Sequence, residues 1–526
     1  MPYRGSHAKL KWPVFQDHSG LLDWTTYLPA IMTRNAQLAD FPLAVRAADA
    51  TLFRWLYDEI RTAIVAGRLH AGARLPSSRS LARQHNVARG TVVAAFEQLA
   101  AEGYVECVVG SGTFVKPVRS EALFEAKPLR AASRPVNPPM GLSARGRRLA
   151  QQPFPRLVAN QSVLTFRLDR PALDVFPIKT WSRLTARCLK RARPELLSHG
   201  QSLGLRSLRE AIATYVGLTR GIKCSADQVV ITSGTQQSVD LVARLLLDPG
   251  DPVWVEDPGY SAVAVLLRAV GAEVIGIPVD GEGLQWSAGR RRHRSARLAY
   301  VTPGCQFPLG VTMSLPRRRA LLEWARRENA WIFEDDYDGA FRFSGRPLAA
   351  LQSLDASGHV IYSNTFNKLL FPSLRLAFLV VPPRLVDAVA AARSVLERFP
   401  PLLDQSILCD FITEGHLALH MRRMRDLYAS RLDRLVRCAR SELGGVLEMS
   451  PQRAGLQIVG WLPETVDDIQ ACQMAAAHGV DSVPLSLLGV DRKPPAGLVL
   501  GVASPGDHAI RRGIERLGRA LRELQR

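Results

Sequence analysis

The spacing of apolar residues divides the chain into two regions with different periods. From Thr51 onward, Leu52, Leu56, Ile60 and Ile64 recur every four positions, which places them on one face of a helix. From about residue 160, short apolar runs of strand length alternate with helix-length segments. Such alternation is typical of a mostly parallel sheet with helices on both faces. The pattern predicts a small helical domain followed by a larger α/β domain.

The N-terminal region continues with two more helices and a hairpin. Ser77 is placed to cap a short helix, and the next helix turns Val92, Phe96 and Leu99 inward. Two strand-like segments then flank the glycine-rich turn 110–112. This order predicts a winged helix-turn-helix whose recognition helix enters a DNA major groove. The alternative is a helical subdomain of an enzyme with solvated charges.

The region beyond residue 160 is expected to contain seven strands before a change of pattern. After Pro400 the sequence favours long helices and a few strands, which predicts a small C-terminal α+β lobe from about residue 400. We therefore expect an unassigned extension over 1–44, a DNA-binding domain over 45–117, a basic proline-rich linker over 118–160 and an α/β domain over 161–526. The predicted strands are 228–233, 252–257, 273–278, 298–303, 331–335, 360–364 and 375–381.

Composition and charge narrow the class of protein. The 526 residues are 47% hydrophobic and 22% charged, as in globular proteins of two or three domains. The net charge of +20 indicates a polyanionic partner. The absence of a long uncharged apolar run predicts a cytoplasmic protein without a membrane partner. The seven cysteines lack CxxC spacing, so we expect neither a disulfide framework nor a metal site.

Lys368 is the main candidate for covalent chemistry. It lies between two apolar runs, near residues 360–362 and 376–381. A lysine held partly desolvated near other cations has a lowered pKa and becomes a nucleophile toward an aldehyde. This chemistry favours a Schiff base with pyridoxal 5'-phosphate. The alternative is a surface lysine in an ordinary loop.

Two other strand ends complete a candidate cofactor site. Asp335 ends an apolar run and is placed to pair with a protonated pyridine nitrogen, while Tyr337 is placed to bond the phenolic oxygen of the ring. Ser233, Gly234 and Thr235 follow a predicted buried strand and open a helix. Free backbone N–H groups at a helix start bind phosphate. Ligands gather at strand ends in such sheets.

Three segments carry a family resemblance. They are 256–260 (EDPGY), 302–310 (TPGCQFPLG) and 334–338 (EDDYD). With the N-terminal pattern, they make the chain resemble the MocR subgroup of GntR transcriptional regulators. The resemblance implies a winged helix-turn-helix fused to a domain of aminotransferase fold type I that binds pyridoxal phosphate.

The resemblance assigns further residues. It implies that Tyr260 stacks on the pyridoxal ring and that Thr365 and Arg375 bind the phosphate. In the N-terminal domain it implies DNA contacts from Arg79, Arg89, Thr91 and, at the wing tip, Gly110. Gly90 departs from the expected pattern, because it has no side chain with which to read a base.

The substrate side also departs from the catalytic pattern. Related aminotransferases hold the substrate α-carboxylate with an arginine where this chain has Val499, and some relatives carry another where it has Ala262. Losing such a charge-assisted contact weakens the binding free energy of an amino acid by roughly 1.5–3 kcal/mol. We expect weak binding of free amino acids.

These observations predict a transcriptional regulator that binds double-stranded DNA and senses a small-molecule effector, an amino compound, through its aminotransferase-like domain. By resemblance we expect a head-to-tail homodimer. One alternative is a catalytically active aminotransferase with an accessory N-terminal domain. Another keeps the regulator but makes pyridoxal phosphate itself the effector.

Overall fold

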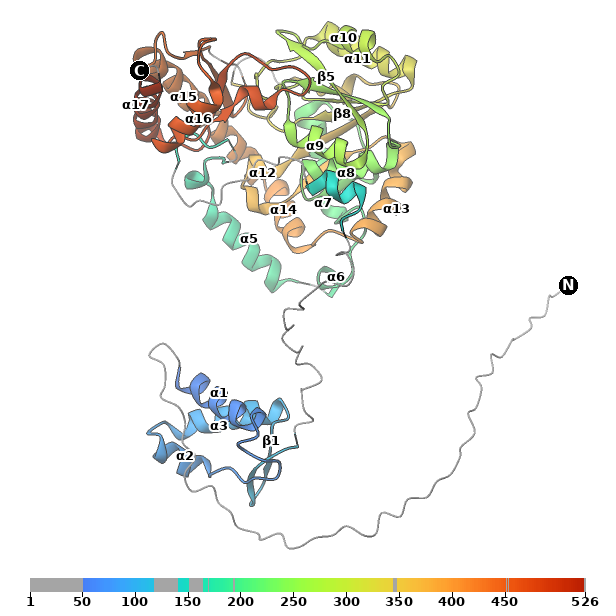
Figure 1. Ribbon diagram of the computed structural model, residues 1–526. Coiled ribbons are helices and arrows are strands. Elements are labelled where there is room, and N and C mark those ends of the chain that lie inside the picture. Colours follow the sequence, from blue (N-terminus) through green and yellow to red (C-terminus); the bar gives the residue numbers. More distant parts are fainter. Residues whose placement is uncertain are drawn as a thin grey trace, which may run out of the picture. The chain divides into compact units, whose positions relative to one another are not determined.

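The computed structural model describes residues 51–117, 141–150, 164–168, 170–192, 194–343, 348–450, 452 and 454–524. The chain separates into two compact units, Met1–Met140 and Gly141–Arg526 (Figure 1). The predicted extension over 1–44 and most of the predicted linker lie outside the described residues. No helix in the described part of the chain is long and apolar enough to cross a membrane.

The N-terminal unit is a winged helix-turn-helix, as predicted. Its helices are α1 (Leu52–Val65), α2 (Ser78–Gln84) and α3 (Arg89–Ala101), and its wing pairs β1 (Val105–Val108) with β2 (Gly112–Val115) in antiparallel register. The Ser77 hydroxyl accepts a hydrogen bond from the Ser80 N–H at 3.1 Å and caps α2. Val92, Phe96 and Leu99 are buried in the core with the apolar face of α1. The helical spacing of the apolar residues therefore predicted the buried faces of these helices.

An eight-stranded sheet forms the centre of the C-terminal unit. Its strand order is β3-β10-β9-β8-β7-β4-β5-β6. The pairs from β9 through β8, β7 and β4 to β5 are parallel, whereas β10 is antiparallel to both neighbours and β6 is antiparallel to β5. All seven predicted strands are present, with ends within two residues of the prediction. The strands are β3 (Val229–Thr232), β4 (Pro252–Asp257), β5 (Glu273–Asp280), β6 (Gly283–Leu284), β7 (Leu298–Val301), β8 (Trp331–Asp335), β9 (Val360–Thr365) and β10 (Ala377–Val380).

Helices cover both faces of this sheet (Figure 1). Successive strand residues point to opposite faces. Val255 packs with Val263 of α9, whereas Trp254 points to the other face and stacks on Trp324 of α11 at 4.1 Å between ring centroids. Helices α8, α9 and α13 therefore cover one face, and α7, α11 and α14 the other. The helices are α5 (Ile178–Lys190), α6 (Pro194–Leu197), α7 (Arg206–Arg220), α8 (Thr235–Leu246), α9 (Ser261–Val270), α10 (Trp286–Arg292), α11 (Leu315–Glu328), α12 (Phe366–Leu369), α13 (Val386–Leu396) and α14 (Leu403–Thr413).

A smaller lobe follows α14 in sequence and is built around an antiparallel sheet. The strand order is β11-β12-β14-β13. Helices α15, α16 and α17 pack with this sheet around a second core (Figure 1). The elements are α15 (His416–Glu442), β11 (Glu448–Met449), β12 (Gln457–Trp461), α16 (Asp468–Ala477), β13 (Val483–Pro484), β14 (Gly497–Gly501) and α17 (Asp507–Leu524).

One part of the predicted extended linker is helical. Helix α4 (Ala144–Ala150) contains no proline, and Arg145 and Leu149 line a groove with Leu266 of α9. The prolines that suggested an extended segment lie outside this stretch. Helix α4 lies close to α9 in the structure.

Candidate functional site

The predicted cofactor residues lie where β3, β8 and β9 end. Asp335 is the last residue of β8, Lys368 lies in α12 directly after β9, and Gly234 precedes α8 after β3. The Lys368 ammonium nitrogen lies 4.8 Å from the centroid of the Tyr337 ring. Three segments that are far apart in sequence thus converge at one edge of the sheet, as expected for this fold class.

Asp335 is buried and has one unused oxygen. Its Oδ2 accepts a hydrogen bond from the Tyr300 hydroxyl at 2.7 Å, whereas Oδ1 has no partner among the described residues. Burial raises the pKa of Asp335 to about 7, although the hydrogen bond from Tyr300 opposes this shift. A protonated pyridine nitrogen would give Oδ1 a charged donor. The carboxylate therefore fits the pyridine end of pyridoxal phosphate.

The start of α8 forms the other end of the site. Gly234 has a φ of 150°, and a Cβ at this position would lie 3.0 Å from the Arg375 guanidinium. Thr365 lies at the end of β9 with its hydroxyl accepting from the Asn367 N–H at 3.2 Å. Glycine therefore lets a guanidinium lie against the helix start, where Ser233 and Thr235 also lie. This is a suitable cradle for a phosphate dianion.

Aromatic rings line the space between these ends. Phe307 makes edge contacts with Tyr260 at 5.8 Å and with Tyr337 at 6.2 Å between centroids. The small lobe reaches the same place, because the Gln457 amide donates a hydrogen bond to the Tyr337 hydroxyl at 2.7 Å. Phe307, Gln457 and Tyr300 were not predicted from the sequence. Only the register of β7 beside β8 places Tyr300 on the same face as Asp335.

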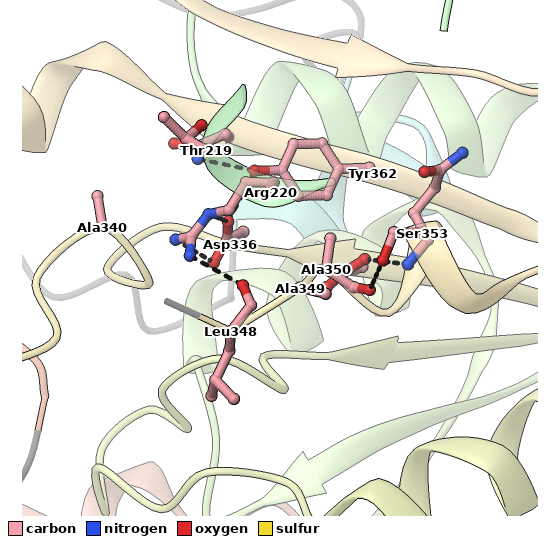
Figure 2. Close-up of polar contacts among 12 residues, drawn as sticks. Thr219, Arg220, Asp336, Ala340, Leu348, Ala349, Ala350, Ser353 and Tyr362 are labelled. Carbon is pink, nitrogen blue, oxygen red and sulfur yellow. Dashed lines mark hydrogen bonds and ion pairs between the residues drawn. The ribbon is translucent and has the colours of Figure 1, made fainter. Parts of the chain in front are cut away.

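A buried polar network lies behind the site (Figure 2). Arg220 forms an ion pair with Asp336, with 2.7 Å between Nε and Oδ2. The Tyr362 hydroxyl donates to the same oxygen at 2.7 Å and accepts from the Asn364 amide at 3.0 Å. The side-chain oxygen Oδ1 of Asn364 in turn accepts a hydrogen bond from the Thr365 backbone N–H at 2.6 Å. The network thus joins the neighbour of Asp335 to a predicted phosphate ligand.

The charge of Arg220 is well matched by this network. Burial opposes its charged form, but Asp336 raises the pKa of Arg220 above its ordinary value. Figure 2 shows its guanidinium also directed toward the carbonyl of Leu348, at 3.5 Å. A buried ion pair with these partners is costly to break from one side. Because Asp336 directly follows Asp335, this ion pair also holds the backbone of Asp335 in place.

We expect Tyr362→Phe to weaken both the fold and cofactor binding. The substitution leaves Asp336 and Asn364 without one hydrogen bond each, which costs about 1–3 kcal/mol of unfolding free energy. We expect an affinity for pyridoxal phosphate about tenfold lower, because tenfold corresponds to about 1.4 kcal/mol. Thermal unfolding and equilibrium dialysis measure the two effects.

Tyr428→Phe is a matched control for this prediction. Its buried hydroxyl accepts from the Ala172 N–H at 3.0 Å and takes no part in the network. The control should lower thermal stability but leave cofactor affinity unchanged. Equal affinities in Tyr362→Phe and the control would show that the network does not support the site.

The predicted DNA-binding residues lie on α2, α3 and the wing. Arg79 belongs to α2, and the exposed Arg89 is the first residue of α3, where its Nε donates to the Ser78 hydroxyl at 3.4 Å. Thr91, two residues further on in α3, is half-buried. Gly110, with a φ of 78°, lies in the turn between β1 and β2. The described residues contain no cluster of three His, Cys, Asp or Glu placed to hold a metal ion.

Two family models match the chain, one for each compact unit. Residues 54–115 match the gntR family of bacterial regulatory proteins. Residues 173–517 match aminotransferase class I and II. A winged helix-turn-helix joined to an aminotransferase fold defines a class of transcriptional regulator.

Relatives and solved structures agree with this architecture. The chain is 39% identical to the probable rhizopine catabolism regulatory protein MocR of Rhizobium meliloti, over 91% of this chain and 96% of that protein. It is 29% identical to the pyridoxine biosynthesis transcriptional regulator PdxR of Corynebacterium glutamicum, over 90% and 97%. The solved kynurenine aminotransferase of Pyrococcus horikoshii is 27% identical, with a TM-score of 0.65 over 73% of this chain and 95% of that one. This chain belongs to the MocR-type transcriptional regulators of the GntR family.

Proposed function

We propose that this regulator binds pyridoxal phosphate through Lys368 and that a small effector at the same site changes its hold on DNA. The observation that carries the proposal is the buried Oδ1 of Asp335, which has no partner in the described residues. An uncompensated buried carboxylate is costly unless a ligand completes it. Bound pyridoxal phosphate supplies an aldehyde that reacts with amines and a ring that withdraws electrons.

Each side chain has a distinct role in this proposal. Lys368 would hold the aldehyde carbon, Asp335 the pyridine nitrogen and Tyr337 the phenolic oxygen. Tyr260, whose ring is still 37% exposed, would cover the pyridoxal ring. The phosphate would be bound by Ser233, Gly234, Thr235, Thr365 and Arg375.

In a homodimer, the two DNA-binding units would place one α3 each on an operator. Arg79 and Arg89 would contact phosphates or base edges, Thr91 would follow Arg89 into the major groove, and Gly110 would bring the wing backbone close to DNA. We propose a head-to-tail homodimer acting in the cytoplasm. Effector binding would then change the spacing of the two DNA half-sites by favouring one dimer arrangement.

A catalytic aminotransferase is the second candidate, because several solved structures of similar fold are aminotransferases. The buried, apolar environment of Val499 favours the regulator, since it offers no cation to a substrate carboxylate. Rapid transamination of common amino acids without sequence-selective DNA binding would reverse this order.

The decisive experiment is a footprint on the DNA upstream of the chain's own gene. We expect protection of two half-sites, with a pattern that differs between the apo and cofactor-loaded protein. A matched DNA fragment with scrambled half-sites is the control. Equal affinity and equal footprints with and without pyridoxal phosphate would contradict the proposed link between the cofactor site and DNA binding.

A further inference from the structure

The small-lobe sheet presents one face to the candidate cofactor site. In the antiparallel pair of β12 and β14, Gln457 lies opposite Gly501 and Val459 opposite Val499. Residues opposite each other point to the same face, and so do residues two apart on one strand. Because the Gln457 amide reaches the Tyr337 hydroxyl at 2.7 Å, this face is the one directed at the site.

That face is apolar apart from Gln457. Val459 and Val499 form a buried cluster with Leu485 and Leu488, and this cluster also contacts Phe307. The Phe307 ring makes edge contacts with both Tyr260 and Tyr337. The apolar cluster therefore extends from the small lobe to the rings that border the site.

Among the described residues, β12 and β14 bring no cation to this wall. Neither β12 nor β14 contains a charged residue. Arg375 lies at the other end of the site, beside Gly234, where it serves the phosphate cradle. A carboxylate placed against β12 and β14 would lose its hydration without gaining a charged partner, which is strongly unfavourable.

We propose that the effector is a primary amine that lacks a carboxylate and has an uncharged body. This inference deepens the proposed function and rests on it, because the amine is the group that a lysine-held aldehyde recognises. Phe307, which packs on the apolar cluster, contacts the body of the ligand, and Gln457 beside Tyr337 offers one neutral hydrogen-bonding group. Amino acids are excluded by the cost of desolvating their carboxylate.

The test uses the full chain loaded with pyridoxal phosphate and pairs of probes that differ only by a carboxylate. Isoamylamine is compared with leucine, and tyramine with tyrosine. Binding is followed by calorimetry and by the change in visible absorbance. We expect each amine to bind at least about tenfold more tightly than its amino acid.

Val499→Arg should remove most of this preference. The introduced guanidinium would face the site and pair with a carboxylate, so we expect leucine to bind at least about tenfold more tightly than to the unaltered chain. Val499→Leu changes volume without charge and is the matched control. Val459→Arg, opposite Val499 on the same face of the sheet, provides a second variant if Val499→Arg fails to fold.

The outcomes are separable. Amino acids that bind as tightly as their amines would overturn the inference, and so would a loaded protein that responds to neither member of a pair. In both cases the visible absorbance of the loaded protein still supports the proposed cofactor. If that absorbance never appears on loading, the proposed function itself fails and the inference fails with it.

Discussion

Lys368→Ala is expected to abolish covalent attachment of pyridoxal phosphate and the visible absorbance of the loaded protein. Lys368 lies in α12, directly after β9, with its ammonium nitrogen 4.8 Å from the centroid of the Tyr337 ring. Only an amine can form the bond to the aldehyde. Absorbance and intact mass after borohydride reduction and dialysis measure the loss.

The same substitution should remove the stabilisation that the cofactor gives. A ligand present at one hundred times its dissociation constant stabilises the folded state by about 2.7 kcal/mol. We expect the rise in Tm on adding pyridoxal phosphate to shrink sharply in Lys368→Ala. The exposed Lys223→Ala is the matched control and should keep both the absorbance and the rise in Tm. Retained absorbance in Lys368→Ala would assign the attachment to another amine.

Arg89→Ala is expected to weaken operator binding with no change in cofactor loading. Arg89 is exposed at the first position of α3, the helix that we propose enters the major groove. Loss of a bidentate base contact costs about 1–3 kcal/mol, roughly 5- to 150-fold in affinity. Loss of a phosphate contact instead lowers, by about one, the slope of the logarithm of DNA affinity against the logarithm of salt concentration. Fluorescence anisotropy with operator and scrambled DNA at several salt concentrations distinguishes the two.

Arg68→Ala is the control for this prediction. Arg68 is exposed in the same unit but lies after α1, outside α2, α3 and the wing. The substitution Arg68→Ala removes the same charge as Arg89→Ala and should leave operator affinity nearly unchanged. Equal losses in the two variants would mean that Arg89 acts only through net charge.

The individual elements were largely predictable because their signals are local. The four-residue spacing from Leu52 to Ile64 gives α1, and Ser77 caps α2 through a bond to a residue three positions away. Apolar runs gave all seven predicted strands. Helix α4 was missed, because its contact with α9 depends on a surface more than a hundred residues away in sequence.

The sequence by itself determined the two-part architecture and the chemical types at the site, since Lys368, Asp335 and the glycine before α8 each follow a recognisable apolar run. Only the tertiary structure decided which of their atoms have partners. The Tyr300 bond to Asp335, the contact of Gln457 with Tyr337 and the Arg220–Asp336 pair all join distant segments. The sheet also places β3 beside β10 and β4 beside β7, two pairs of strands that are not consecutive in sequence. Local periodicity specifies each strand, but the order of strands decides which side chains meet.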